Sequence, residues 1–244
     1  MFSIFNKKIK ISELFNDATD IHNHVLPGID DGAKTIEDSL EMLEKFKALG
    51  FKSINATPHT MSDFYPNTKE SIFEALTNVQ GQLKNDSIRL KATSEYMLDP
   101  NFEEVLKNNP EKLLTFNDNH ILVEMSFYRP YDRFEEVLYD LQLKGFQPIL
   151  AHPERYLYYA DKITYFTTLK NKGVRLQLNT LSLTNHYGTK TNEITKKLLA
   201  DDLYDFIGTD AHKIEHLNKI ETIKIASKYS NTISKLLQNN KALF

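Results

Sequence analysis

The chain has 244 residues, of which 41% are hydrophobic and 26% are charged, so it is long enough to bury one sizeable core. Its 30 Lys and Arg residues are balanced by 33 Asp and Glu residues, and this net charge of −3 gives no reason to expect binding to nucleic acid or to an anionic membrane. The sequence has no cysteine, which excludes disulfides, iron–sulfur clusters, thiolate zinc sites and a cysteine nucleophile. Any metal ion must therefore be held by nitrogen and oxygen ligands.

We expect neither a membrane-spanning segment in the chain nor a secretion signal at its start. No apolar run approaches the roughly 18 residues of a membrane-spanning helix. The first ten residues, MFSIFNKKIK, lack the long apolar segment and small-residue cleavage site of a secretion signal. We therefore expect a cytoplasmic protein without membrane insertion.

Short runs typical of β-strands alternate along the chain with amphipathic, helix-like stretches. The runs are residues 19–24, 52–57, 89–96, 120–125, 146–152, 174–179 and 205–209. In the first helix-like stretch Thr35 is a predicted N-cap, with Asp38 three residues later and Gly50 as the predicted end. Two later stretches end in the same way, at Gly145 and Gly173.

Repeated strand–helix units indicate a parallel sheet with helices outside it. Seven such units favour a closed or nearly closed barrel over two linked domains. No linker-like segment divides the chain, so we expect residues 1–244 to form a single domain.

Six of the seven predicted strands end in His, Asp or Glu, always at the carboxyl end. These residues are His22, His24, His59, Glu95, Glu124, His152, Asp210 and His212, and a turn after the first strand adds Asp30 and Asp31. Residues two apart on a strand face the same side, so His22 and His24 can point together. Barrels of this kind place their active sites at this end.

Several carboxylates in one pocket repel one another unless they are protonated or neutralised by cations. Mixed His and carboxylate ligands suit Mn²⁺, Fe²⁺ or Zn²⁺, and this number of candidates exceeds the need of one ion. Two or three divalent ions are therefore expected, an arrangement that serves phosphoryl transfer. Arg155 offers a planar fork suited to phosphate oxygens, although a salt bridge at the rim is the alternative interpretation.

In their order along the chain these motifs resemble the PHP (polymerase and histidinol phosphatase) superfamily. The resemblance spans residues 20–212 and is strongest to its bacterial metal-dependent protein-tyrosine phosphatases of capsule and exopolysaccharide synthesis. The stretches that carry it are DIHNH (20–24), GIDDG (28–32), TPH (57–59), ILVEM (121–125), AHPERY (151–156), QLNTLS (177–182) and DAH (210–212).

The resemblance implies a distorted (β/α)7 TIM-like barrel, the PHP fold, with a metal site at the C-terminal rim of the strands. The implied ligands of two or three ions, most often Mn²⁺, are His22, His24, Asp31, His59, Glu95, Glu124, His152, Asp210 and His212. Asp31 rather than Asp30 matches the family position, and Glu124 is the expected bridging carboxylate. Arg155 matches a phosphate-binding arginine and, with Asp210 and His212, is expected to be catalytic. Related sequences often carry a further arginine a few residues beyond the DAH motif; here the run is KIEH (213–216), so this second phosphate contact is either absent or supplied by Lys213, His216 or Arg129.

The resulting hypothesis is a metal-dependent protein-tyrosine phosphatase in which a hydroxide bridging the ions attacks phosphorus. The implied partner is a tyrosine-phosphorylated protein, in particular the tail of a bacterial tyrosine kinase of polysaccharide export. A small-molecule phosphatase of the histidinol-phosphate type, or a phosphodiesterase, would use the same ligands and is the alternative. A module that binds phosphotyrosine without turnover is a third interpretation. The sequence does not fix the oligomeric state.

Other aromatic and histidine residues have weaker signals. Four tyrosines on loops after strands could flank a phosphotyrosine ring, although surface packing is the simpler interpretation of each. They are Tyr65, Tyr128, Tyr131 and Tyr187. No function is expected for His120, and His186 is expected to be a solvated loop residue.

Overall fold

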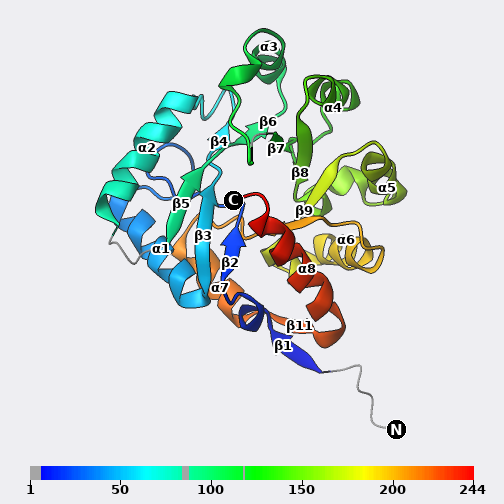
Figure 1. The fold of residues 1–244 in the computed structure, drawn as a ribbon. Helices are drawn as coiled ribbons and strands as arrows, with labels where there is room; N and C mark the ends of the chain where they lie inside the picture. Colours follow the sequence, from blue (N-terminus) through cyan, green and yellow to red (C-terminus); the bar gives the residue numbers. More distant parts are fainter. Residues whose placement is uncertain (1–6, 84–87, 118) are drawn as a thin grey trace.

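The structure is a computed structural model that describes residues 7–83, 88–117 and 119–244, in which strands surround a centre and helices lie outside them (Figure 1). The strands are β1 Lys8–Lys10, β2 Ala18–Asp20, β3 Phe51–Ala56, β4 His59–Thr60, β5 Arg89–Ala92, β6 Glu95–Met97, β7 His120–Glu124, β8 Gln147–Ala151, β9 Arg175–Asn179, β10 Phe206–Gly208 and β11 Lys224–Ala226. The α-helices are α1 Ile36–Leu49, α2 Lys69–Gln82, α3 Pro100–Asn108, α4 Phe134–Leu143, α5 Thr164–Asn171, α6 Thr189–Ala200, α7 Ile214–Thr222 and α8 Ser230–Lys241. The predicted absence of a secretion signal concerned the first ten residues, and six of these, residues 1–6, lie outside the described residues.

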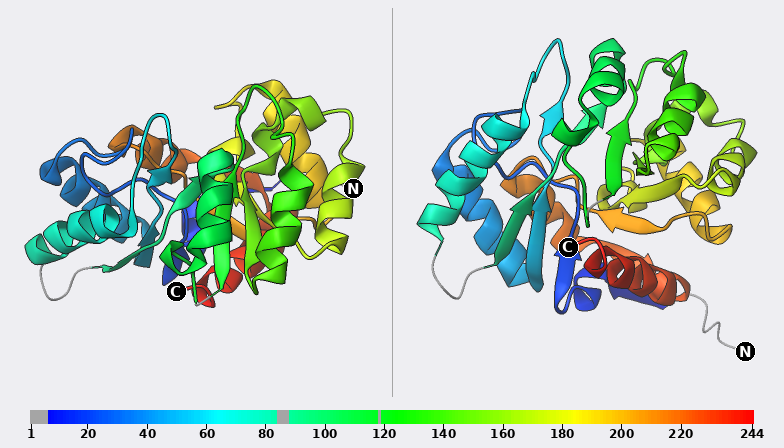
Figure 2. Two further views of the ribbon diagram at one scale, coloured as in Figure 1. Left: turned by 90° about the horizontal axis from the view of Figure 1, so that it is seen from above. Right: turned by 45° about the horizontal axis from the view of Figure 1, so that its top comes forward.

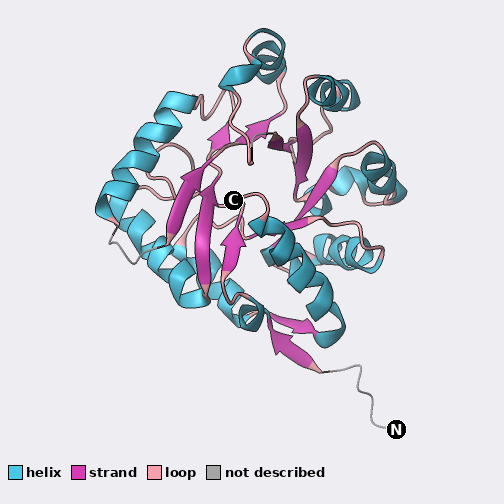
Figure 3. Ribbon diagram, viewed as in Figure 1, coloured by secondary structure: helices cyan, strands magenta, loops and turns pink. Residues whose placement is uncertain are grey.

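The central strands form two parallel sheets rather than one closed barrel. One has the order β10-β9-β8-β7-β6-β4 and the other the order β2-β3-β5, and together they curl around the centre (Figures 2 and 3). The parallel α/β architecture is confirmed, whereas a continuous (β/α)7 barrel is not. In the described residues β1 and β11 form a separate antiparallel pair that the sequence did not indicate.

The predicted strand 89–96 is wrong as a single element. It divides into β5 and β6, which belong to different sheets. The division follows from the backbone between them, where the Thr93 N–H donates to the Ala56 carbonyl (2.8 Å) before the chain crosses to pair with β7. The short strand β4 pairs with β6 and was not predicted either.

The helix predicted from Thr35 to Gly50 is confirmed as α1. The Thr35 side chain accepts a hydrogen bond from the Asp38 N–H (3.2 Å), and the Asp38 carboxylate accepts one from the Thr35 N–H (3.1 Å). This reciprocal pair satisfies amides that the helix itself cannot. Gly50 ends the helix with φ 104°, a left-handed conformation that favours glycine. Similarly, α4 and α5 end two residues before Gly145 and Gly173.

Side chains and isolated backbone hydrogen bonds, rather than a continuous strand ladder, join the two sheets at β2 and β10. Just beyond these strands the Asp210 N–H donates to the His22 carbonyl (2.7 Å), and the His24 N–H donates to the Ala211 carbonyl (2.9 Å). The buried Asp20 carboxylate accepts hydrogen bonds from the Thr209 N–H (2.9 Å) and hydroxyl (2.8 Å). From α8, the buried Asn240 amide donates to the carbonyls of Thr19 (2.9 Å) and Ile207 (2.6 Å) and accepts from the Ile207 N–H (3.2 Å). Helix α8 contacts both strands and lies beside β2 in Figure 1, so it ties the two sheets together.

A small apolar cluster fills the space between the strands. It consists of Ile21, Phe116, Leu122, Ile149, Ala151, Phe206 and Leu243. Because side chains alternate along a strand, Leu122 places Glu124 on the same inner face, two residues nearer the carboxyl end. This apolar cluster therefore lies directly beneath the carboxyl ends of the strands. In the described residues no helix has both the length and the apolar character needed to cross a membrane.

Replacing Asn240 with Leu, which has a similar volume and no polar atom, should lower the free energy of unfolding by about 2–4 kcal/mol, because three buried backbone groups would lose their partner. Chemical denaturation measures this change. Gln238→Ala on the exposed face of the same helix is the control and should change it little. Equal stability of Asn240→Leu and wild type would show that α8 does not join the sheets.

Candidate metal centre

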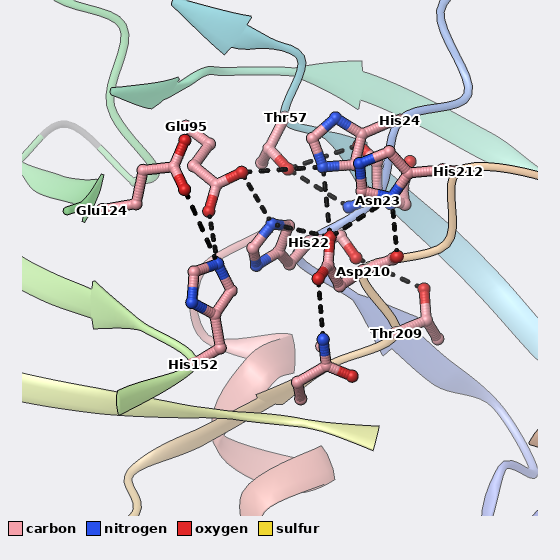
Figure 4. A network of polar contacts seen from close by, with 12 residues as sticks. His22, Asn23, His24, Thr57, Glu95, Glu124, His152, Thr209, Asp210 and His212 are labelled. Atoms are coloured by element: carbon pink, nitrogen blue, oxygen red, sulfur yellow. Dashed lines mark hydrogen bonds and ion pairs between the residues drawn. The ribbon is translucent and has the colours of Figure 1, made fainter. Parts of the chain in front are cut away.

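The structure brings all nine predicted ligand residues to one place, at the carboxyl ends of the strands. They form four overlapping groups in which the donor atoms lie within 4.8 Å of one another: His24, Asp31, His59 and His212; His22, His152 and Asp210; His22, His24 and Glu95; and His59, Glu95 and Glu124. Most of these side chains point toward one another from different strands (Figure 4). Their spatial convergence, expected from the strand ends, is confirmed, whereas their role as ligands stays a prediction.

Glu95, on β6, lies at the centre of this cluster. Its Oε2 is 3.1 Å from His22 Nε2 and 3.1 Å from His59 Nδ1, and its Oε1 is 2.9 Å from His152 Nε2. Glu124, the expected bridge, lies 2.9 Å from His59 Nδ1 and 3.9 Å from His152 Nε2. Since Glu95 belongs to two of the four groups and Glu124 to one, Glu95 is at least as well placed to bridge ions.

Asp210 uses its two carboxylate oxygens differently. Oδ1 faces the cluster, 3.3 Å from His24 Nε2 and 3.5 Å from His22 Nε2. Oδ2 faces away and accepts hydrogen bonds from Arg155 Nη1 (2.9 Å) and Asn179 Nδ2 (2.7 Å). These two donors fix the carboxylate so that its other oxygen stays directed at the histidines.

The two histidines after β2 are each oriented by a buried partner on the ring nitrogen that faces away from the cluster. His22 Nδ1 is 2.8 Å from Gln177 Oε1, and His24 Nδ1 is 2.7 Å from Asp30 Oδ2. Both contacts leave Nε2 facing the cluster, as in metal sites whose histidines are held by outer partners. Sequence reasoning assigned no role to Asp30, Gln177 or Asn179. The alternation of Gln177 and Asn179 on the inner face of β9 is the signal that could have indicated them.

The histidines and carboxylates of this cluster shift one another's pKa values in favour of their charged forms. Burial opposes protonation of His22, but the carboxylates of Glu95 and Asp210 outweigh it and raise its pKa. Burial also opposes protonation of His24, yet Asp30 and Asp210 raise its pKa to about 10. For Glu95, burial favours the neutral form, but His22 and His59 hold its pKa well below the usual value. A divalent cation would replace these protons, because metal ligands bind in their deprotonated form.

Several buried polar atoms of the cluster make no hydrogen bond of suitable geometry in the described part of the chain, although some of them face one another in the close histidine–carboxylate contacts given above. They are His22 Nε2, His24 Nε2, His59 Nδ1, Glu95 Oε2 and Glu124 Oε1. Buried polar atoms are nearly always paired, so nitrogen and carboxylate atoms left unpaired and facing one another fit divalent cations. The backbone is strained at two of the candidate ligands, His152 (φ 34°) and Asp210 (φ 51°), as functional sites often are.

The residues expected to bind phosphate are placed unequally. Arg155 lies at the edge of the cluster, paired with Asp210. His216 accepts a hydrogen bond at Nδ1 from the His212 N–H (3.3 Å). Arg129 is exposed, with its guanidinium 4.0 Å from the Asp132 carboxylate. No contact assigns a second phosphate-binding residue, and Lys213 likewise stays a prediction.

Two of the four loop tyrosines reach the site. The Tyr65 ring stacks on His59 (centroids 5.8 Å apart), and the Tyr187 ring lies against Arg155. Tyr128 is exposed, and the Tyr131 hydroxyl is hydrogen-bonded to Glu103 instead. His120, at the start of β7, and His186, whose ring lies beside Tyr187 and His216, are not among the converging ligands.

The chain is similar in sequence and fold to known proteins. The sequence matches the family described as "Capsular polysaccharide synthesis, CpsB/CapC" over residues 18–242. It is 33% identical to tyrosine-protein phosphatase YwqE of Bacillus subtilis over 202 residues. This aligned region covers 82% of this chain and 79% of that protein. It also resembles a solved structure from a study of YwqE from Bacillus subtilis and CpsB from Streptococcus pneumoniae, described there as metal-dependent tyrosine phosphatases. The two structures align with a TM-score of 0.76 and 28% sequence identity, over 93% of this chain and 96% of that one. A histidinol phosphate phosphatase from Lactococcus lactis, solved with zinc, L-histidinol and phosphate, aligns with a TM-score of 0.51 and 18% identity over 84% of this chain and 92% of that one, a likeness of fold alone.

Gly208 is a further supporting residue, because an added Cβ would lie 2.5 Å from His22 Cβ and 2.8 Å from Gln177 Nε2. Gly208→Ala should displace the His22 ring and lower the affinity for Mn²⁺ about 10- to 100-fold, the range for changes in residues that orient metal ligands. Titration of the chelator-treated protein with Mn²⁺ measures the affinity. Gly81→Ala in α2, where an added Cβ meets nothing within 4 Å, is the control and should bind Mn²⁺ as wild type does. Unchanged affinity in Gly208→Ala would remove His22 from the predicted ligands.

Proposed function

The chain belongs to the capsular polysaccharide synthesis family CpsB/CapC, and we propose that it is a metal-dependent phosphatase that hydrolyses phosphotyrosine in protein substrates. One observation carries this proposal: five histidines and four carboxylates converge in a chain that has no cysteine. A relative named tyrosine-protein phosphatase and a solved structure from a study of metal-dependent tyrosine phosphatases support it. A cysteinyl-phosphate route is closed to this chain because it has no thiol.

We propose that the nine converging side chains hold two or three divalent ions, Mn²⁺ before Fe or Zn. Their chemistry supports this, since mixed nitrogen and carboxylate donors suit these ions. When bound, such ions activate water and neutralise charge on phosphoryl oxygens. We further propose that the two sheets correspond to a distorted (β/α)7 barrel within a single domain of residues 1–244, with the side-chain bridges between β2 and β10 in place of a ladder.

The chain's own residues have three tasks in this proposal. Arg155 binds phosphoryl oxygens with its guanidinium, which is only 19% exposed and therefore poorly solvated. Asp210 fixes Arg155 through Oδ2 while it faces the histidines through Oδ1. His212 packs its ring on that of His24 (centroids 3.8 Å apart), which encloses the cluster on that side. The leaving group is a phenolate with a pKa near 10, which needs less protonation than an alkoxide.

The physiological substrate in this proposal is a tyrosine-phosphorylated protein, and specifically the tail of a bacterial tyrosine kinase of polysaccharide export, reached in the cytoplasm. The family's description as a capsular polysaccharide synthesis group supports the connection to polysaccharide export. The balanced charge of the chain supports a protein substrate over a nucleic acid.

Activity on a phosphotyrosine peptide should depend on divalent metal and on the cluster. Chelation should abolish hydrolysis and Mn²⁺ should restore it, whereas a thiol-alkylating reagent should have no effect. Asp210→Ala and His152→Ala should each lower kcat/KM about 100-fold or more, because even the outer partners of metal ligands cost 10- to 100-fold. Asp161→Ala, at an exposed carboxylate, is the matched control and should match wild type. Hydrolysis by Asp210→Ala or His152→Ala at the wild-type rate would show that the site lies elsewhere.

A substrate panel should separate this proposal from a small-molecule phosphatase or phosphodiesterase on the same cluster. With Mn²⁺ present, kcat/KM should be highest for phosphotyrosine peptides and lower for histidinol phosphate and for a phosphodiester. Steady-state rates at matched metal content give the comparison. A steep preference for histidinol phosphate would overturn the tyrosine phosphatase assignment while leaving the metal site intact. Bound metal without turnover of any phosphoester would indicate a binding module.

A further inference from the structure

The guanidinium of Arg155 lies between two aromatic rings. Its Cζ is 4.1 Å from the centroid of Phe127, in the loop after β7, and 4.1 Å from the centroid of Tyr187, in the loop before α6. Contacts of this kind are attractive, because the negative face of a ring meets a delocalised cation. The guanidinium therefore makes two cation–π contacts in addition to its hydrogen bond with Asp210.

Both rings are themselves fixed by the site. Phe127 packs against the rings of His152 (5.4 Å) and Tyr156 (5.9 Å), and the buried Tyr156 hydroxyl accepts a hydrogen bond from the Met125 N–H (3.1 Å). The Tyr187 hydroxyl accepts a hydrogen bond from Asn179 Nδ2 (3.2 Å), the same amide that donates to Asp210. The two rings therefore fix the position of the Arg155 side chain relative to the residues of the candidate metal site.

The remaining edge of Arg155 is available for a ligand. Nη1 donates to Asp210 Oδ2 (2.9 Å), and within the described residues the other N–H groups of the guanidinium have no hydrogen-bond partner. The side chain is 19% exposed, so this edge is not closed off from solvent. A guanidinium fixed by two rings and one carboxylate has little freedom left to lose when it binds phosphate oxygens.

Phe127 is placed in an otherwise unfavourable position. It is an apolar ring at the rim with 40% of its surface exposed. Its neighbour Tyr128 is 95% exposed and donates a hydrogen bond through its backbone, from its N–H to Ser126 Oγ (3.2 Å). Of these two adjacent aromatic residues, Phe127 packs on His152, Tyr156 and Arg155, whereas Tyr128 extends into solvent.

We propose that Phe127 and Tyr187 are positioning residues that hold Arg155 ready to bind a phosphoryl group, and that they set phosphate affinity without contributing to metal binding. For the substrate phosphoester this inference rests on the proposed function. For inorganic phosphate it rests only on Arg155 and the cluster. The aromatic character of both side chains is the property that matters, and the hydroxyl of Tyr187 is secondary.

The test compares ring-removing and ring-keeping variants of the full chain loaded with Mn²⁺. Phe127→Leu and Tyr187→Leu should weaken binding of inorganic phosphate, measured by calorimetry, about 5- to 20-fold, the range for loss of a partly desolvated cation–π contact. They should raise KM for a phosphotyrosine peptide by a similar factor and leave the bound Mn²⁺ per chain unchanged. Phe127→Tyr and Tyr187→Phe, which keep the rings, should bind phosphate within about twofold of wild type. Tyr128→Leu is the matched control and should also bind it as wild type does.

Three results would overturn the inference. They are wild-type phosphate affinity in both Leu variants, equal losses in the ring-keeping and ring-removing variants, and loss of Mn²⁺ from the Leu variants. If one Leu variant fails to fold, the comparison at the other position decides the question. That comparison is Phe127→Leu against Phe127→Tyr, or Tyr187→Leu against Tyr187→Phe. Ring-dependent phosphate binding by a protein that does not hydrolyse phosphotyrosine would support the positioning role and overturn the proposed function instead.

Discussion

The concentration of negative charge at the carboxyl ends of the strands is the constraint on which the rest of the site depends. Glu95, Glu124 and Asp210 are buried there, and Asp31 lies half-exposed at the edge. Buried carboxylates are costly unless each meets a positive charge or several donors. Five histidines surround these four groups, and the buried groups favour one another's charged forms: the pKa values of His22 and His24 are raised and that of Glu95 is lowered. The same arrangement suits divalent cations, which would satisfy the unpaired nitrogen and oxygen atoms together.

The fold supplies both the burial and the direction of these groups. Two inward-facing residues on the same strand can serve different purposes. On β7, Leu122 packs in the small apolar cluster, and Glu124, two residues closer to the carboxyl end, belongs to the candidate metal site. Past the end of β8 and of β10 the chain turns sharply, and His152 and Asp210 adopt left-handed backbone conformations. That strain is sustained because hydrogen bonds from neighbouring segments hold the turns, including the one from the Asp210 N–H to the His22 carbonyl (2.7 Å).

The features that could be predicted from the sequence are those that depend on local rules. Thr35, Asp38 and Gly50 define a helix by capping alone, and the polar strand ends follow from composition and alternation. The features that could not be predicted depend on contacts between distant segments. Nothing near residue 93 indicates that β5 and β6 join different sheets, and nothing near Asn240 indicates that it bridges β2 and β10 from more than 30 residues away. Likewise, Gly208 is understood only when the His22 and Gln177 side chains beside it are known.

Asp210 connects the metal side of the site to its phosphate side. One of its oxygens faces the histidines, and the other accepts hydrogen bonds from Arg155 and Asn179. A substitution of Arg155 would therefore have two effects: it would remove the hydrogen bond that holds Asp210, a candidate metal ligand, and it would remove a phosphate-binding group. Activity alone could not distinguish these two effects. Phe127 and Tyr187 contact Arg155 through their rings, whereas Asp210 contacts it through a hydrogen bond. The aromatic rings are therefore the positions at which phosphate binding can be altered while both donors to Asp210 remain, because substituting a ring removes neither Arg155 nor Asn179.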